Sequence, residues 1–397
     1  MTRSLFALLV LLLVSTSLRA DTPTEGKRHT GPWNMAELKK VPEATWGETK
    51  GLVQEVYYAG ESYKGKPTRI FAYYAKPEGN GPFPAMVLVH GGGGQAFQEW
   101  AELWAKRGYA ALAMDTAGQG PGKKRLDDGG PPQDDGTKFM QFTAESTRDM
   151  WTYHAVAAVV RGHSLLASRP EVDKNRIGIT GISWGGYLTC IVSGIDDRLK
   201  VSVPVYGCGF LQDNSVWLGQ FAKMKDDEKA RWVKFWDPSQ YLGGVSCPIL
   251  FVNGTNDFAY PLDSYQKSYS LVRDPQLTVI VRLPHGHQAG WTPVEIGLFV
   301  DSVLKDGTPL PRLKSGKSAE KSLAATVDSK TAIKKAEIHF APAQGAWQQR
   351  IWKSVEAQID NTTISASIPA ERPIVAYLTV TDERGATVST PHVVVEK

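Results

Sequence analysis

Gly181-Ile-Ser-Trp-Gly-Gly186 is the stretch that decides the fold, because it has the form G-x-S-x-G. The apolar, β-branched run 176–180 precedes it and predicts a buried strand, while the apolar run 187–192 follows it and predicts a buried helix. Small residues at such a strand-to-helix turn leave a serine open to a base and a carbonyl. The stretch predicts a nucleophile elbow at Ser183. A glycine-rich turn around an inactive serine has the same form, so the prediction depends on the rest of the chain.

A second glycine-rich turn follows another predicted core strand. The continuous apolar run 85–89 leads directly into His90 and the four glycines 91–94. Backbone N–H groups that no side chain obstructs can face a developing oxyanion. We expect the N–H groups of Gly92 and Trp184 to form an oxyanion hole. A flexible turn before the next helix is the alternative.

An acid and two histidines follow two later predicted strands. Asp257 comes after the strand predicted over 248–252, and His285 and His287 come after the strand predicted over 277–283. A serine nucleophile needs a base to take its proton and a carboxylate to orient that base. The order Ser, Asp, His is that of α/β-hydrolases, and all three residues would meet at the carboxyl edge of one parallel sheet.

We predict that His287, and not His285, is the base. Pro284 holds His285 in an extended conformation, whereas Gly286 allows a sharp turn that swings the next side chain toward Ser183. The predicted catalytic residues are therefore Ser183, Asp257 and His287. His285 stays open as the alternative base.

Strands and helices alternate over most of the chain, which predicts a mostly parallel sheet with helices on both faces. This α/β-hydrolase domain is expected over 21–311, with an aromatic-rich helical cap inserted over about 209–243. A Lys/Ser-rich linker is expected over 312–322, followed over 323–397 by strands alone. That last pattern predicts a small all-β sandwich, which carries no cluster of titratable residues and is expected to serve packing or docking.

Composition limits the partners and the compartment. Residues 1–20 combine a basic start, a short apolar run and small residues, so they predict a secretory signal and an exported protein, periplasmic or extracellular. That run is too short for a stable membrane span. A net charge of +4 over 397 residues suggests no nucleic-acid partner. We expect no metal or other cofactor, and Cys190, Cys208 and Cys247 as free thiols.

Residues of roughly 50 to 307 resemble an α/β-hydrolase of the dienelactone hydrolase, prolyl oligopeptidase and acetyl xylan esterase group. The resemblance rests on four segments: 90–94, 181–186, 253–257 and 284–287. It implies a serine, acid and histidine triad and an acyl-enzyme intermediate. Dienelactone hydrolases carry a cysteine in the elbow, where this chain has Ser183, and prolyl oligopeptidases usually carry a large propeller that this chain has no room for before its first hairpin. Both departures favour an ester substrate.

The sequence thus predicts an exported serine carboxylesterase that hydrolyses acyl esters, with acetyl groups on carbohydrate favoured by the resemblance. A prolyl-oligopeptidase-like serine peptidase is the alternative enzyme. A binding protein that kept the hydrolase fold without its chemistry is a further alternative. The sequence leaves the oligomeric state open.

Overall fold

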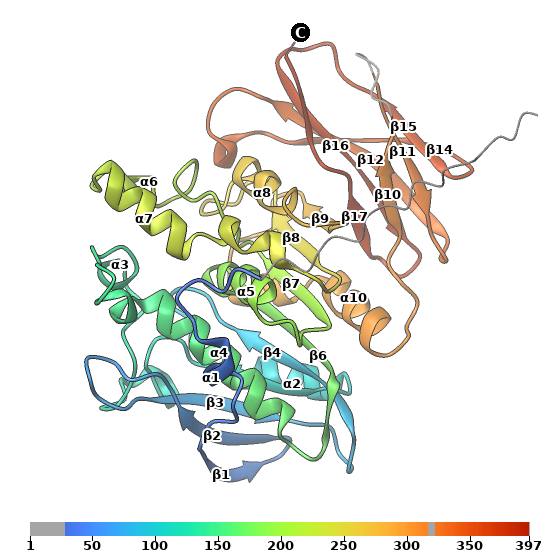
Figure 1. The fold of residues 1–397 in the computed structure, drawn as a ribbon. Coiled ribbons are helices and arrows are strands. Elements are labelled where there is room, and N and C mark those ends of the chain that lie inside the picture. The colour runs from blue at the N-terminus through green and yellow to red at the C-terminus, as the bar shows by residue number, and fades with distance from the viewer. Residues whose placement is uncertain (1–27, 317–321, 397) are drawn as a thin grey trace, which may run out of the picture.

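The computed structural model describes residues 28–316 and 322–396, and the chain forms two parts that lie side by side (Figure 1). The first part is a sheet flanked by helices. The second, after residue 311, consists of strands and one short 3₁₀ turn among the described residues. The predicted secretory signal, residues 1–20, lies outside the described residues.

The first part is built on a nine-stranded sheet. Its strands are β1 (Ala44–Lys50), β2 (Val53–Ala59), β3 (Arg69–Ala75), β4 (Phe83–Val89), β5 (Ala110–Met114), β6 (Val172–Ile182), β7 (Val201–Val205), β8 (Leu250–Gly254) and β9 (Gln276–Ile280). They lie in the order β1-β2-β3-β5-β4-β6-β7-β8-β9. The first three strands are antiparallel, β3 pairs antiparallel with β5, and the six strands from β5 to β9 are parallel. The loops after β4, β6, β8 and β9 therefore meet at one edge.

Helices cover both faces of this sheet, as the alternating pattern predicts. The longer ones are α2 (Gln98–Lys106), α4 (Trp151–Ala167), α5 (Trp184–Ile195), α8 (Leu262–Tyr269) and α10 (Val294–Leu304). Helices α2 and α4 both pack on β4 and β5, from opposite faces, and α4 also contacts α5. Among the described residues, no helix is both long and apolar enough to cross a lipid bilayer.

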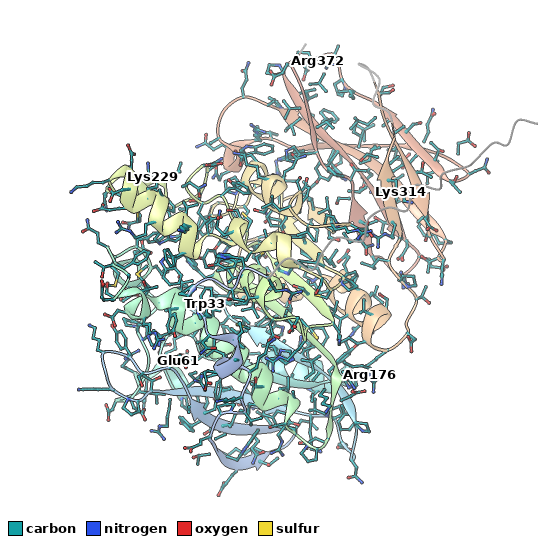
Figure 2. The ribbon with its side chains drawn as sticks, viewed as in Figure 1. Trp33, Glu61, Arg176, Lys229, Lys314 and Arg372 are labelled. Atoms are coloured by element: carbon teal, nitrogen blue, oxygen red, sulfur yellow. The ribbon has the colours of Figure 1, made fainter. Side chains whose placement is uncertain are left out.

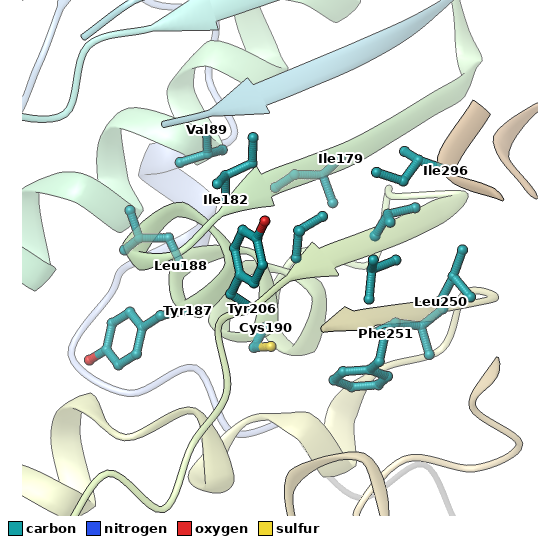
Figure 3. Close-up of a cluster of buried hydrophobic side chains, with 14 of the residues drawn as sticks. Val89, Ile179, Ile182, Tyr187, Leu188, Cys190, Tyr206, Leu250, Phe251 and Ile296 are labelled. Atoms are coloured by element: carbon teal, nitrogen blue, oxygen red, sulfur yellow. The ribbon is translucent and has the colours of Figure 1, made fainter. Parts of the chain in front are cut away.

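The centre of the sheet is apolar on both faces, which is typical of parallel strands covered by helices. Figure 3 shows Val89, Ile182, Leu188 and Phe251, from three strands and α5, in one buried cluster. All twelve residues of α5 are buried. The free thiol of Cys190 belongs to the same cluster, and Cys208 and Cys247 are also free, as expected.

The segment predicted as a helical cap, 209–243, lies between β7 and β8. It contains α6 (Leu218–Phe221), α7 (Asp226–Trp236) and two short 3₁₀ turns. The segment before β1 packs beneath it through Trp33 (Figure 2), whose ring lies edge-on to Trp236 with centroids 5.8 Å apart. The indole N–H of Trp33 also donates to the carbonyl of Tyr153 at 2.9 Å. These contacts join the start of the described chain to the cap and to α4.

The C-terminal part is a two-layer antiparallel sandwich, as predicted. Its strands are β10 (Arg312–Ser315), β11 (Ser322–Asp328), β12 (Ile333–Pro342), β13 (Lys353–Glu356), β14 (Gln358–Asp360), β15 (Thr363–Ser367), β16 (Ile374–Asp382), β17 (Thr387–Ser389) and β18 (Val393–Val395). One layer has the order β10-β11-β15-β14. The other has the order β13-β12-β16-β17, and β18 also pairs with β16. The layers meet through β11 against β16 and β12 against β15.

The linker expected over 312–322 is partly wrong. Residues 312–315 form the strand β10, which pairs with β11 and exposes Lys314 (Figure 2). An edge strand with one solvent face tolerates lysine and serine, so composition alone suggested a linker there. Residues 317–321 of the expected linker lie outside the described residues.

The sandwich packs directly on the edge strand β9 of the first part. The hydroxyl of Thr278 donates to the Thr387 carbonyl, and the N–H of Val279 donates to the hydroxyl of Ser389, both at 2.8 Å. The carboxylate of Glu295, from α10, accepts a hydrogen bond from the N–H of Thr387. Buried apolar residues continue from one part to the other. The strand β17 thus covers an edge that would otherwise be exposed.

Candidate active site

Ser183 stands at the turn between β6 and α5. Its backbone has φ 60° and ψ −118°, in the positive-φ region that residues other than glycine rarely adopt. The N–H of Ser183 donates to the Val205 carbonyl, and the Ser183 carbonyl accepts from the N–H of Tyr187, both at 2.9 Å. This strained turn has the geometry of a nucleophile elbow at the carboxyl edge of the sheet.

Glycines allow the backbone segments around Ser183 to approach each other. A Cβ atom on Gly185 would lie 1.9 Å from the carbonyl oxygen of Val89. A Cβ atom on Gly181 would lie 2.2 Å from the carbonyl oxygen of Gly185. Both distances are too short for any side chain, so glycine at these positions lets β4, β6 and α5 pack together and position the serine.

Two hydrogen bonds connect Ser183, His285 and Asp257. The Nε2 atom of His285 lies 2.9 Å from Ser183 Oγ, and its Nδ1 atom lies 2.6 Å from Asp257 Oδ2. Asp257 is buried, and its Oδ1 atom accepts hydrogen bonds from the N–H groups of Ala259 at 2.9 Å and Tyr260 at 2.8 Å. These donors fix the carboxylate, and the carboxylate fixes the imidazole. The arrangement can move a proton from Ser183 to Nε2.

The structure corrects the prediction for His287, because His285 occupies the position expected for it. His287 is the first residue of the short helix α9 (His287–Trp291), and its ring lies against the glycine loop after β4. Gly286 has φ 178°, so it is extended and does not make the sharp turn that the prediction required. The start of α9 therefore turns His287 toward Gly91 and leaves His285 facing Ser183.

His287 holds the glycine loop instead. Its Nε2 atom accepts a hydrogen bond of 2.9 Å from the N–H of Gly91. Burial, assisted by the nearby His90, lowers the pKa of His287 to about 4. A neutral ring keeps the lone pair that this hydrogen bond needs. His90 also holds the loop, since its Nε2 atom accepts from the N–H of Thr116 at 2.9 Å.

The residues predicted for the oxyanion hole lie beside the elbow. A Cβ atom on Gly91 would lie 2.8 Å from Ser183 Cβ, and one on Gly92 would lie 3.0 Å from Trp184 Cδ1. No hydrogen bond from the N–H of Gly92 or Trp184 occurs within 28–316 and 322–396. Trp184 is the first residue of α5, so the positive end of the helix dipole lies at its N–H. The oxyanion hole stays a prediction that this geometry permits.

Three aromatic residues that the sequence analysis missed surround His285. The ring of Tyr206 stacks on it at 4.4 Å, Phe258 lies edge-on at 4.7 Å, and Tyr260 lies parallel at 6.3 Å between centroids. Phe258 is 53 % exposed and forms part of the rim of the site. Tyr206 follows β7, and the other two follow Asp257. All three residues lie in loops that follow strand ends at the carboxyl edge of the sheet, and this position in the sequence could have identified them as candidates for the site.

The cap contributes one ring to this region. Trp217 lies 4.4 Å from Trp184 and 5.2 Å from Tyr260, between ring centroids. Trp232 instead stacks on Phe139 at 5.3 Å and is buried in the cap. Only some of the cap aromatics therefore reach the site. Among the described residues, no group of three or more His, Cys, Asp or Glu side chains could hold a metal ion.

Comparison with known proteins identifies families and relatives that match this chain. The acetyl xylan esterase (AXE1) family matches residues 35–243, and the family of PhoPQ-activated pathogenicity-related proteins matches residues 217–349. The acetyl esterase Axe7A of Xylanibacter ruminicola is 22% identical over 223 residues, which is 53% of this chain and 51% of that protein. The uncharacterized peptidase YuxL of Bacillus subtilis is 27% identical over 266 residues, 60% of this chain and 35% of that protein. The chain thus spans about half or less of these curated relatives.

Two solved structures share the fold. The acetyl xylan esterase 1 of Thermoanaerobacterium sp. superimposes with a TM-score of 0.54 at 20% identity, covering 68% of this chain and 96% of that one. The acetyl xylan esterase of Paenibacillus sp. R4 gives a TM-score of 0.53 at 21% identity, covering 64% and 87%. These structures establish an α/β-hydrolase fold. Because the AXE1 family match spans more than half of the residues, the chain belongs to the acetyl xylan esterase (AXE1) family of hydrolases.

Proposed function

We propose that the protein is an exported serine esterase that removes acetyl groups from carbohydrate. The observation that carries this proposal is the hydrogen-bonded chain Ser183–His285–Asp257 at the carboxyl edge of the sheet. Serine hydrolases on this fold use such a chain to form and hydrolyse an acyl-enzyme. The catalytic residues proposed are these three.

Acylation begins when Ser183 Oγ attacks the ester carbonyl carbon and its proton moves to His285 Nε2. The carbonyl π electrons move to the oxygen, which the N–H groups of Gly92 and Trp184 stabilise. The C–O bond to the alcohol then breaks, and His285 gives the proton to the departing alkoxide. Water repeats these steps against the acyl-enzyme, releasing acetate and free Ser183. Asp257 stabilises the imidazolium in each half of the cycle.

The family supports acetyl as the acyl group, because both the curated relative Axe7A and the two solved structures are named as acetyl or acetyl xylan esterases. The rim supports a carbohydrate alcohol. Phe258 exposes half of its side chain beside His285, and an exposed ring offers a flat apolar surface to the C–H face of a sugar. Residues 1–20 support export, which would bring the enzyme to polysaccharides outside the cytoplasm.

Substrate panels test this proposal against the two alternatives. The purified protein is assayed on 4-nitrophenyl acetate, acetylated xylo-oligosaccharides and short proline-containing peptides, with Ser183→Ala as the control. We expect acetate release from both esters by the wild-type protein and none by the variant. Cleavage of peptides without acetate release would favour a peptidase, a possibility raised by the match to YuxL. Failure of a fluorophosphonate to label Ser183 would favour a binding protein without catalysis.

Export is tested separately. The full chain and a version lacking residues 1–20 are expressed in a Gram-negative host, and the periplasmic and cytoplasmic fractions are probed for the protein. We expect the full chain to reach the periplasm in a shortened form and the truncated chain to stay in the cytoplasm. If the full chain and the truncated chain are distributed equally between the periplasmic and cytoplasmic fractions, residues 1–20 are not a secretory signal.

A further inference from the structure

Lys123 is an exposed residue in a backbone conformation that lysine rarely adopts. It has φ 63°, in the left-handed region, and the residue before it, Gly122, has φ 64°. Both lie in the segment between β5 and α3 (Asp135–Lys138). A residue with a Cβ atom is strained in this conformation, and such strain is found most often at functional sites. Glycine at position 123 would avoid the strain, so the lysine side chain itself needs an explanation.

The loop that carries Lys123 is held in place by hydrogen bonds. The guanidinium of Arg125 donates to the carbonyl of Gly129 at 3.0 Å. The backbone N–H of Arg69, at the start of β3, donates to the carbonyl of Asp128 at 2.8 Å, and the side chains of these two residues form an ion pair. These contacts tie the loop to itself and to the sheet, so the fold determines where Lys123 lies.

The side chain of Lys123 reaches the glycine turn after β4. Its ammonium donates a hydrogen bond of 2.7 Å to the carbonyl of Gly93, and no other group among the described residues donates to that carbonyl. Gly92 and Gly93 are the central residues of this turn, which is closed by the N–H of Gly94 on the carbonyl of Gly91 at 3.1 Å. A Cβ atom on Gly93 would meet no atom within 4 Å. Lys123 is therefore the contact that holds the outer half of the turn.

Two histidines hold the start of the same turn. The N–H of Gly91 donates to His287 Nε2 at 2.9 Å, and the carbonyl of Gly91 accepts from His90 Nδ1 at 2.7 Å. The N–H of Gly92, the candidate oxyanion donor, lies between these contacts and the one at Gly93. Glycine has more backbone freedom than any other residue, so the direction of this N–H depends on contacts on both sides of it.

We propose that Lys123 is a positioning residue for the oxyanion hole, whose ammonium fixes the Gly93 carbonyl and so directs the N–H of Gly92 at the tetrahedral intermediate. This inference rests on the proposed esterase function. In acylation the bond from Ser183 Oγ to the carbonyl carbon forms, the π electron pair moves to the carbonyl oxygen, and the serine proton moves to His285. Lys123 touches none of these atoms and keeps its own proton. Its left-handed backbone presents the side chain to the turn.

The test removes the ammonium and keeps the length of the side chain, with Lys123→Met assayed on 4-nitrophenyl acetate. We expect kcat to fall about tenfold with KM almost unchanged, because the turn stabilises the oxyanion of the transition state and does not bind the ester in the ground state. Removal of an oxyanion donor itself costs about 100-fold or more. The fall should be smaller here, since Gly92 keeps its N–H and only the direction of that N–H loosens.

Lys123→Gly separates this role from a merely structural one. The variant loses the same hydrogen bond to Gly93, but it also relieves the strain at φ 63°. We expect kcat to fall about tenfold, as in Lys123→Met, while the melting temperature stays the same or rises. A lysine that only stabilised the loop would lose activity and stability together.

Lys124→Met is the matched control. Lys124 is the next residue, is equally exposed, and its side chain makes no hydrogen bond or ion pair within the described ranges 28–316 and 322–396. The variant removes the same charge from the same loop without touching the Gly93 carbonyl. We expect kcat within about twofold of wild type and an unchanged melting temperature.

Three results would overturn the inference: wild-type kcat in Lys123→Met, a raised KM with unchanged kcat, or equal losses of kcat in Lys123→Met and Lys124→Met. The last result would mean that the charge of the loop, and not the contact with Gly93, supports catalysis.

The rate of Ser183 labelling by a fluorophosphonate separates this inference from the proposed function. Attack on phosphorus also places negative charge on an oxygen in the oxyanion hole, so Lys123→Met should react about tenfold more slowly than the wild-type protein. If the wild-type protein hydrolyses no acetyl ester but is labelled, the proposed function fails, and slower labelling of Lys123→Met would still support the role of Lys123. Equal labelling rates would overturn that role whatever the substrate.

Discussion

The side-chain amide of Asn256 donates a hydrogen bond of 2.8 Å to the carbonyl of Arg350, across the boundary between the hydrolase sheet and the C-terminal sandwich. The same nitrogen donates to the carbonyl of Gln348 at 3.1 Å. Asn256 directly precedes Asp257, so a loop of the sandwich holds the loop that carries the proposed catalytic acid. The C-terminal part contributes no residue to the Ser183–His285–Asp257 chain, yet it contacts the segment that positions it.

Asn256→Ala removes both of these contacts. We expect it to lower the free energy of unfolding by about 1–3 kcal/mol, because two partly buried carbonyls lose their donor. Its kcat should fall modestly, by less than about tenfold, since the N–H donors of Ala259 and Tyr260 still hold Asp257. Urea denaturation and initial rates measure the two effects. Asn175→Ala, on the exposed surface, is the control and should change neither quantity. If Asn256→Ala keeps the wild-type free energy of unfolding and kcat, the loop that carries Asp257 does not depend on the sandwich.

The strain at Ser183 gives a prediction about stability. Both Ser183→Ala and Ser183→Gly should lose several powers of ten in kcat, because each removes the nucleophile. The glycine variant should be as stable as the alanine variant or more so. Relief of the strain at φ 60° is worth about 1–3 kcal/mol and offsets the roughly 1 kcal/mol by which glycine favours the unfolded chain. Thermal unfolding of the two variants provides the comparison. A glycine variant clearly less stable than the alanine variant would argue against a strained elbow.

The elements that sequence reasoning placed correctly share one property. Ser183 follows β6, which is buried from Ile177 to Ile182, and Asp257 follows β8, which is buried throughout. A parallel sheet brings the ends of such strands to one edge. The pattern of strands without helices also predicted the C-terminal antiparallel sheets. Sequence reasoning could not locate the contact between Asn256 and the sandwich, because that contact depends on how the two parts of the chain pack on each other.

The choice between the two histidines failed for a related reason. Both follow β9 within a few residues, so the strand pattern does not separate them. What separates them is the direction of each side chain, and α9 begins at His287 and turns that ring toward Gly91. The local argument from Gly286 assumed a sharp turn at a residue that is extended in the structure. Side-chain direction near a helix start depends on packing that the residue types alone do not specify.

Stability should fall as the pH is lowered from about 6.5 to 4. Burial lowers the pKa values of His287, His339 and His392 to about 4 each, against about 6.5 in an unfolded chain. Between these values the unfolded state binds more protons than the native state, so the free energy of unfolding rises with pH there and falls as pH falls. Each histidine contributes up to about 1.4 kcal/mol per pH unit. Urea denaturation at pH 7 and pH 4.5 measures the difference.

His339→Gln isolates one of these contributions. His339 is buried in β12, and its two ring nitrogens lie 2.8 and 2.9 Å from the hydroxyls of Ser354 and Thr379. The variant should be less stable at pH 7, because it disturbs these hydrogen bonds, but its loss of stability between pH 7 and pH 4.5 should be smaller than that of the wild-type protein. An equal loss would mean that His339 does not titrate differently in the folded and unfolded states.

Alanine substitution of each histidine decides which of them is the base. His285→Ala should lower kcat by several powers of ten, because it removes the only imidazole that bridges Asp257 and Ser183 in the described residues. His287→Ala should lower kcat by about tenfold or less, since it releases the N–H of Gly91 and loosens the glycine loop without removing the proton acceptor. Single-turnover release of 4-nitrophenol measures acylation directly, and circular dichroism checks that both variants fold. Imidazole added to the buffer should restore part of the activity of His285→Ala and none of that of His287→Ala, because only the first leaves a cavity beside Ser183. The reverse pattern, with the large loss of kcat and the rescue by imidazole at His287, would mean that His287 and not His285 takes the proton from Ser183.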